Sequence, residues 1–294
     1  MAGFLLQLRW SGKTREMGAM NDMPVWLQRI LGREAHKPVA PEGLCIYAIG
    51  DIHGRLDLAV QLIRQIASHS RTLPEHKCMV FLGDYIDRGP DSRQVIDLLL
   101  DLKTTFAGWE IIYLRGNHDQ AILDFLADPQ FYRAWRGFGA QETLLSYGVV
   151  PPRFDDVAAF ETAAAQLREV LPASHLAFFE GLQYSAVKGD YMFVHAGIRP
   201  GQPLDGQAPE DLLWIRDEFL FSNRAFGKVI VHGHTPTERP VQRHNRIGID
   251  TGAHATDRLT AAVLRHDTCE FLVSTPATGY VERSGTLADA RGTT

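Results

Sequence analysis

The residues Gly83-Asp84-Tyr85-Ile86-Asp87-Arg88-Gly89 lie between two segments of different character. Before them, residues 78–82 (CMVFL) form a short apolar run that is typical of a buried strand. After them, apolar residues recur at helical spacing from Val95 to Leu102, which predicts a helix. Two carboxylates and an arginine therefore occupy a strand-to-helix turn. In open α/β sheets, ligands bind at such turns, at the carboxyl ends of the strands.

Two turns of the same design flank this one. Residues 45–49 run into Gly50-Asp51-Ile52-His53-Gly54, and residues 111–114 run into Arg115-Gly116-Asn117-His118-Asp119. Asp51 and Asp84 lie 33 positions apart, as do Asp84 and Asn117, and this is the length of a strand–helix–strand unit. Such units give parallel strands with right-handed crossovers. The polar residues of the three turns are therefore expected to meet at one edge of one sheet: Asp51, His53, Asp84, Asp87, Arg88, Asn117 and His118.

This set is rich in the oxygen and imidazole groups that hold hard or borderline divalent metals. Two later strand-like segments end in histidines. Residues 192–195 (MFVH) end in His195, and residues 229–234 (VIVHGH) end in His232 and His234. If these segments lie at the facing edge of a second sheet, His195 and one of the other two histidines are expected to complete two metal sites. The sequence leaves open whether His232 or the nearby His254 takes part.

Composition excludes several other classes of protein. The 294 residues carry a net charge of −5 and no basic block, which argues against electrostatic binding of nucleic acid. No apolar run is long enough to span a bilayer, and the N-terminus lacks the charged region of a secretory signal. The three cysteines lie in strand-like contexts without metal spacing, which favours reduced core thiols. We therefore expect a cytoplasmic protein with no membrane or nucleic-acid partner.

The chain divides into three parts by composition. Residues 1–43 are expected to be an N-terminal extension with a short amphipathic helix at 24–32 and a polar linker. Residues 44–275 are expected to form one α/β domain, with a helical insertion at about 120–182 where no strand pattern occurs. The strand-like segments after residue 182 are expected to form the second sheet. Residues 276–294 are rich in small residues and predict a loose tail.

Five motifs in this order resemble the signature of the calcineurin-like metallophosphoesterases: residues 50–54 (GDIHG), 83–89 (GDYIDRG), 116–119 (GNHD), 194–197 (VHAG) and 233–235 (GHT). More narrowly, they resemble the phosphoprotein phosphatase family in its bacterial and phage serine/threonine phosphatase branch. The resemblance runs from about Leu44 to Ser274 and is carried most specifically by the Asp-Arg-Gly of the second motif. It implies a four-layer α/β/β/α sandwich of two mixed sheets, here with the helical insertion.

The resemblance also implies a role for each matching residue. Asp51 and His53 would bind one metal and Asp84 would bridge to the second, whose remaining ligands would be Asn117, His195 and His234. His118 would be the general acid, oriented by Asp87. The phosphate would be bound by Arg88, by Asn117 and, on a weaker match, by Arg216.

The implied activity is that of a phosphomonoesterase of the serine/threonine phosphatase type, acting on a phosphorylated peptide or protein or on a small phosphoester. Two divalent ions about 3.5–4 Å apart lower the pKa of a bound water and stabilise an in-line displacement, so no phosphoenzyme is required. Mn²⁺ is the expected metal, with Fe, Zn, Ni and Co as other candidates. One alternative is a hydrolase that cleaves dinucleoside tetraphosphates symmetrically. An alternative of another class is a non-enzymatic module that binds a phosphorylated ligand.

Overall fold

The computed structural model describes residues 37–276 and 280–282. Its strands form two mixed sheets, as the sequence predicts. The helix expected at 24–32 lies outside the described residues. No helix within the described ranges is long and apolar enough to cross a membrane.

The first sheet has six strands in the order β11-β10-β9-β1-β2-β3. The strands β1, β2 and β3 are parallel to one another, and β9 lies antiparallel on the other edge of β1. Their bounds are β1 Leu44–Ile49, β2 His76–Phe81, β3 Glu110–Tyr113, β9 Leu259–Arg265, β10 Thr268–Ser274 and β11 Tyr280–Glu282.

The second sheet has five strands in the order β4-β5-β6-β8-β7. Within it, β5, β6 and β8 are parallel, and β4 and β7 are antiparallel to their neighbours. Their bounds are β4 Ser185–Lys188, β5 Tyr191–Val194, β6 Val229–His232, β7 Val241–Gln242 and β8 Arg246–Gly248. A parallel bridge between Leu114 and Gln183 lies where the chain passes from the first sheet to the second.

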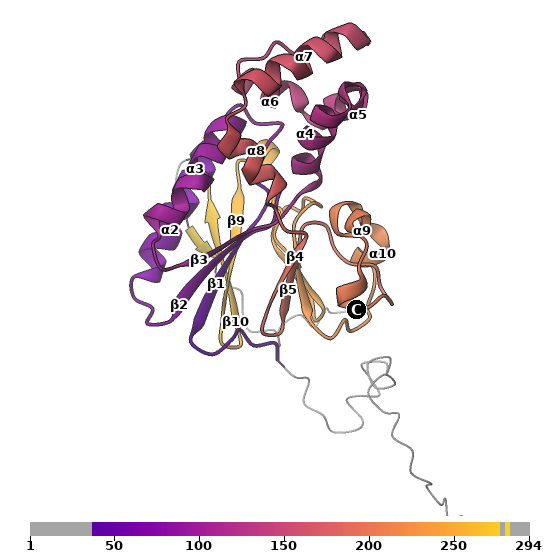
Figure 1. The fold of residues 1–294 in the computed structure, drawn as a ribbon. Coiled ribbons are helices and arrows are strands. Elements are labelled where there is room, and N and C mark those ends of the chain that lie inside the picture. Colours follow the sequence, from indigo (N-terminus) through magenta and orange to yellow (C-terminus); the bar gives the residue numbers. More distant parts are fainter. Residues whose placement is uncertain (1–36, 277–279, 283–294) are drawn as a thin grey trace, which may run out of the picture. The chain divides into compact units, whose positions relative to one another are not determined.

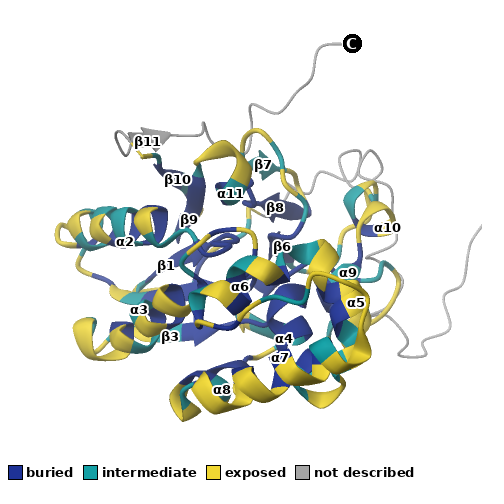
Figure 2. Cartoon of the chain, turned by 90° about the horizontal axis from the view of Figure 1, so that it is seen from above, coloured by how far each residue is buried: buried dark blue, intermediate teal, exposed yellow. Residues whose placement is uncertain are grey.

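Helices cover the outer face of each sheet (Figure 1). The first sheet packs against α2 Leu56–Ser70 and α3 Ser92–Thr105, and the second against α9 Pro209–Trp214 and α10 Asp217–Leu220. Successive side chains of a strand point to opposite faces of its sheet, so neighbouring residues pack into different layers. In β1, Tyr47 packs toward the helices whereas Ile46 and Ala48 pack into the core between the two sheets. In β5, Phe193 belongs to that same central core. The buried residues accordingly lie on the strands and on the inward sides of the helices (Figure 2).

The predicted insertion consists of helices joined by loops (Figure 1). Helical patterns in the sequence predict helices at residues 120–127, 140–147, 157–171 and 174–180, and the structure has each of them, with small shifts at their ends. It adds three short turns of helix between residues 129 and 138, which are too short to show a helical period. The elements are α4 Asn117–Ala127, η1 Pro129–Phe131, α5 Tyr132–Trp135, η2 Arg136–Phe138, α6 Ala140–Ser146, α7 Val157–Val170 and α8 Ala173–Glu180. Two short elements outside the insertion complete the set, η3 Leu204–Gly206 and α11 Ala253–Thr256.

One part of the predicted topology is wrong. Every strand after residue 182 was assigned to the second sheet, yet β9 and β10 belong to the first. The strand β1 is buried on both faces and has β2 on only one edge, so its other edge needs a partner, and β9 supplies it with five residue pairs from Cys45↔Arg265 to Ile49↔Ala261. Within the predicted tail, residues 280–282 form β11 beside β10. The short edge strand β7 was not predicted.

Candidate functional site

Five strand ends supply the candidate site, and its polar residues are buried. Asp51 and His53 follow β1, Asp84 follows β2, Asn117 begins α4 after β3, His195 follows β5 and His234 follows β6. The connecting loops approach one another closely at glycines. A Cβ on Gly83 would lie 2.4 Å from the backbone nitrogen of Gly116, and one on Gly233 would lie 2.0 Å from Asp51 Oδ1. Only glycine allows these turns to come this close.

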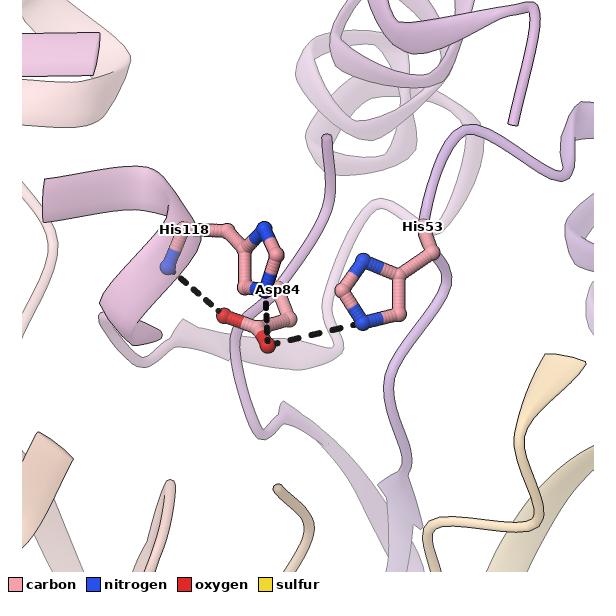
Figure 3. Close-up of side chains that lie close together, drawn as sticks. All are labelled: His53, Asp84 and His118. Carbon is pink, nitrogen blue, oxygen red and sulfur yellow. Dashed lines mark hydrogen bonds and ion pairs between the residues drawn. The ribbon is translucent and has the colours of Figure 1, made fainter. Parts of the chain in front are cut away.

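Asp84 is the centre of this cluster. It belongs to two groups of three potential metal ligands, His53–Asp84–His118 and Asp84–His195–His234, and within each group the ligand atoms lie within 4.8 Å of one another. Its Oδ2 lies 3.5 Å from His53 Nε2 and its Oδ1 lies 3.5 Å from His195 Nε2. Figure 3 shows one carboxylate oxygen of Asp84 facing a ring nitrogen of both His53 and His118. Asp51 belongs to neither group; its carboxylate accepts a hydrogen bond from the backbone nitrogen of His234 at 3.0 Å.

Backbone carbonyls orient two of the imidazoles. The Nδ1 of His53 lies 2.9 Å from the carbonyl oxygen of Ile86, and the Nδ1 of His195 lies 2.9 Å from that of Leu82. Because a carbonyl only accepts, each Nδ1 carries the hydrogen and each Nε2 presents its lone pair to the site. Outer hydrogen bonds of this kind fix the tautomer and ring direction of metal-binding histidines.

The donor set fits a bound cation. The Nε2 lone pair of His195 faces the amide oxygen Oδ1 of Asn117 at 2.9 Å. The same Nε2 lies 3.2 Å from Nδ1 of His234. Burial lowers the pKa of His195, so a second proton on its ring is disfavoured. A divalent ion would satisfy the converging lone pairs of His195 Nε2, Asn117 Oδ1 and His234 Nδ1 at once.

The ionisation of the cluster agrees with this reading. Burial lowers the pKa of His53 well below its usual value and that of His234 to about 2, so both rings are neutral at pH 7. For Asp84, burial alone would raise the pKa, but four surrounding histidines outweigh burial and lower it. For Asp51, burial and the nearby Asp250 and Asp84 carboxylates raise the pKa well above its usual range. These crowded carboxylates are the environment in which a cation is favoured.

A second constellation adjoins the first. His118 Nδ1 lies 2.7 Å from Asp87 Oδ2, and both side chains are buried. The Nε2 of His118 lies 3.8 Å from Asp84 Oδ2 and 3.4 Å from an amino nitrogen of the exposed Arg88. Burial acts to lower the pKa of His118, but Asp84 and Asp87 together raise it. Because Asp87 takes Nδ1–H and the two carboxylates favour a protonated ring, His118 is a candidate for proton transfer as well as one of the potential metal ligands.

Arg216 is exposed and lies at the edge of the site. Its NH1 is 3.4 Å from the hydroxyl of Thr235, the residue after His234. By contrast, His232 lies behind the site, where its ring packs on Phe219 and burial lowers its pKa to about 3. The ring of His254 lies 5.2 Å from that of His53. Of these, only Arg216 was assigned to the site from the sequence.

Backbone strain is concentrated here. Seven residues other than glycine have a positive φ in the described ranges, and five of them belong to the site: His53, Asp84, Asp87, Arg88 and His234. Left-handed backbone costs an ordinary residue on the order of 1 kcal/mol or more and persists where the surroundings enforce it. Such residues cluster at functional sites because the strain positions a side chain that an unstrained turn would not.

Several supporting residues were not predicted. Asp119 is fully buried and accepts hydrogen bonds from the backbone nitrogens of Asp84, Tyr85 and Gly116; its position three residues after Gly116 was the available signal. Trp135 and Thr143 of the insertion donate to Asp87. Neither lies in a recognisable motif.

Two aromatic rings from distant segments lie beside the histidines. Phe138 packs 5.5 Å from the ring of His118 and 5.5 Å from Trp214, and Trp214 lies 6.0 Å from His234, all between ring centres. The pair therefore borders the site on the side of the insertion and of α9.

The profile of the calcineurin-like phosphoesterases matches residues 45–269, which include all five motifs and both constellations. The chain belongs to the calcineurin-like phosphoesterase family. This confirms the resemblance and the fold expected from the sequence. As a member of this family, the chain is a phosphoesterase that uses divalent metals, and its substrates are phosphoesters.

Curated relatives of this calcineurin-like phosphoesterase have two kinds of name. It is 28% identical over 251 residues to the asymmetrical bis(5'-nucleosyl)-tetraphosphatase PrpE of Anoxybacillus flavithermus, with 78% of this chain and 93% of the relative covered. It is 29% identical over 223 residues to serine/threonine-protein phosphatase 1 of Salmonella typhimurium, with 74% and 90% covered. Among solved structures, the cold-active protein-tyrosine phosphatase of a Shewanella species superposes with a TM-score of 0.54 at 17% identity, with 84% of each chain covered, and shares the fold.

Proposed function

We propose that this chain is a dinuclear-metal-dependent phosphomonoesterase of the serine/threonine phosphatase type. The observation that carries the proposal is the buried His118–Asp87 pair at 2.7 Å, whose Nε2 lies beside Asp84 and Arg88. A serine or threonine alkoxide is a poor leaving group and needs a proton as the ester bond breaks, which a positioned histidine can supply. A nucleotide leaving from a phosphoric anhydride needs this proton far less. The pair is therefore most useful to a monoesterase.

The two groups that share Asp84 support the assignment of His53, Asp84, His195 and His234 as ligands; Asp51 and Asn117 are added from the motifs they occupy, and His118 is kept for proton transfer. Asp51 and His53 would hold one ion, Asn117, His195 and His234 the other, and Asp84 both. When bound, the two ions would lower the pKa of water and offset the charge of the phosphate. Mn²⁺ is the ion we propose, with Fe, Zn, Ni and Co as the other candidates; the mixed carboxylate, amide and imidazole donors suit such ions.

The protein's own groups carry the remaining steps. Arg88 and Arg216 would bind phosphate oxygens, Arg88 as a bidentate partner, and Asn117 would add its amide. His118 holds the proton at Nε2 for the departing oxygen, while Asp87 keeps its Nδ1–H directed away from the substrate. No covalent intermediate is needed, because water attacks the phosphorus in line with the leaving oxygen.

Hydrolysis of dinucleoside tetraphosphates is the second candidate. Relatives such as PrpE are named for the asymmetrical reaction, so here the expected products are a nucleoside mono- and triphosphate instead of two diphosphates. The Phe138–Trp214 pair beside the site favours this candidate, because a nucleobase can stack on such rings. On this reading, Phe138→Leu would raise KM for diadenosine tetraphosphate several-fold and leave KM for a phosphothreonine peptide unchanged.

One experiment separates the candidates. The protein is chelated, reconstituted with Mn²⁺, and assayed side by side for phosphate release from a phosphothreonine peptide and for nucleotide release from diadenosine tetraphosphate. We expect a higher kcat/KM for the peptide. A higher value for the dinucleotide would overturn the first candidate in favour of the second. Loss of all turnover on chelation, restored by metal, would exclude a non-enzymatic binding module.

A further inference from the structure

Asp87 is surrounded by more hydrogen-bond donors than the pair with His118 requires. Its Oδ2 accepts from His118 Nδ1 at 2.7 Å and from the indole nitrogen of Trp135 at 2.8 Å. Its Oδ1 accepts from the hydroxyl of Thr143 at 2.6 Å. The Asp87 side chain has no exposed surface. A buried carboxylate with three donors is held in one orientation, because rotation would leave at least one donor unpaired.

The direction of each hydrogen bond around Thr143 is fixed. The Thr143 hydroxyl donates its hydrogen to Asp87 Oδ1, since a carboxylate oxygen only accepts. The same hydroxyl lies 2.9 Å from the backbone nitrogen of Asp87 and 3.0 Å from the hydroxyl of Ser92, and it can accept from both. Ser92 also accepts from the Asp87 backbone at 3.1 Å. Thr143 therefore binds both the side chain and the main chain of Asp87.

The segment from Trp135 to Thr143, which carries these donors, is hydrogen-bonded to the Asp87-Arg88 turn. Trp135 ends α5 and Thr143 lies in α6, and between them Gly139 has a φ of 100°. The carbonyl oxygen of Gly139 accepts from the backbone nitrogen of Arg88 at 3.3 Å. The insertion thus touches the strained Asp87-Arg88 turn at three points, through two side chains and one carbonyl.

We propose that Trp135 and Thr143 are positioning residues for proton transfer by His118. They fix the Asp87 carboxylate so that it receives Nδ1–H of His118 and directs Nε2 toward the phosphate. The inference rests on the proposed function and extends it, since it assigns the helical insertion a part in the reaction itself. A purely structural role would instead be to hold the insertion on the domain.

The test compares leaving groups in the Mn²⁺-loaded enzyme. Thr143→Val and Trp135→Phe remove a donor and preserve shape, and Thr143→Ser restores the hydroxyl. For a phosphothreonine peptide, we expect kcat to fall about tenfold or more in the first two variants and to recover in the third. For 2,4-dinitrophenyl phosphate, whose leaving group needs no proton, we expect kcat to change less than twofold. Metal content should stay at the wild-type value in all three.

Equal losses on both substrates, no loss on either, or no recovery in Thr143→Ser would overturn the inference. His118→Ala is measured alongside. If it also lacks the leaving-group selectivity, the proposed acid role is wrong as well; if it shows selectivity and Thr143→Val does not, only the present inference is wrong. A readout independent of turnover is the Nδ1–H signal of His118 in ¹⁵N-histidine-labelled protein. It should be protected from exchange in the wild type and in Thr143→Ser, and exchange faster in Thr143→Val; equal exchange rates would contradict the inference.

Discussion

His118 is the residue on which the proposed chemistry depends most directly, because its Nε2 lies beside both Asp84 and Arg88. Replacing it by alanine should lower kcat on a phosphothreonine peptide by about 10²–10⁴-fold, the usual contribution of a general acid. Metal content, measured by mass spectrometry of the desalted protein, should remain at the wild-type value. Loss of one metal would instead assign His118 to the ligands, and unchanged turnover would remove it from the reaction.

Asp84 makes a different prediction because it is common to both candidate metal groups. Asp84→Asn keeps the shape but removes the charge and one strong ligand oxygen. We expect metal occupancy and activity to fall together, and adding excess Mn²⁺ to restore little of either. A variant that binds two ions and turns over at the wild-type rate would contradict a bridging role. The matched control is His118→Ala, which should lose activity alone.

For single residues, the sequence predicts which side chains lie close together where a polar residue directly follows a predicted strand. Asp51, Asp84 and His195 each follow an apolar run, so their convergence could be predicted from parallel strands. The partners of Asp87 could not, because Trp135 and Thr143 lie 48 and 56 positions away in a segment without a motif. Their contact depends on how the insertion folds back, which no local pattern encodes.

Among the elements, the junction between η2 and α6 connects the insertion to the site through Gly139. With φ at 100° and a hypothetical Cβ only 2.6 Å from the backbone nitrogen of Arg88, Gly139→Ala should force this junction away from the Asp87-Arg88 turn. We expect the free energy of unfolding to fall by about 1–3 kcal/mol and kcat to fall with it, measured by urea denaturation and peptide assay.

Gly137 offers the matched control two residues earlier. A Cβ there would have no neighbour within 4 Å, and its φ is not in the left-handed range. Gly137→Ala should leave stability and kcat close to wild type. If Gly137→Ala and Gly139→Ala have the same free energy of unfolding and the same kcat, the close contact of Gly139 with Arg88 does not contribute to activity.

The sequence predicts β9 and β10 as strands, but it does not predict the sheet to which they belong. Their apolar character was visible in the sequence, and both were predicted as strands. Their sheet was not, because Leu264 packs between the two sheets whereas Val263 packs toward α2 and α3, and the same alternation would suit either sheet. The strand β9 belongs to the first sheet because it pairs with the otherwise unpaired edge of β1. This unpaired edge can be recognised only once all the strands have been assigned to sheets.

For the molecule as a whole, the candidate metals would join the two sheets. His53 and Asp84 extend from the first sheet, and His195 and His234 from the second. Because ions bind the folded chain and not the unfolded one, Mn²⁺ at 100 times its Kd should add about 2.7 kcal/mol to the free energy of unfolding for each site that it fills. For each site this corresponds to a rise in Tm on the order of 5 °C.

Thermal unfolding followed by fluorescence, after chelation and across a Mn²⁺ titration, measures this effect. Tm should rise with the logarithm of the ion concentration in wild type and in His118→Ala, and the dependence should be weak in Asp84→Asn. A Tm that is the same with and without metal would mean that the two sheets hold their facing edges together without it.

The order of strands along the chain also has a consequence for biosynthesis. The first sheet is begun by β1–β3 and finished only by β9–β11, with the whole second sheet encoded between them. During synthesis on the ribosome, β1 therefore emerges early. The backbone groups on one of its edges stay unpaired until β9, which begins at Leu259, has been made. A bare apolar edge is a template for pairing with other chains. Nascent chains halted before β9 are thus candidates for chaperone capture, and the first sheet, which carries Asp51, His53 and Asp84 of the candidate site, is completed only after β9 has been made.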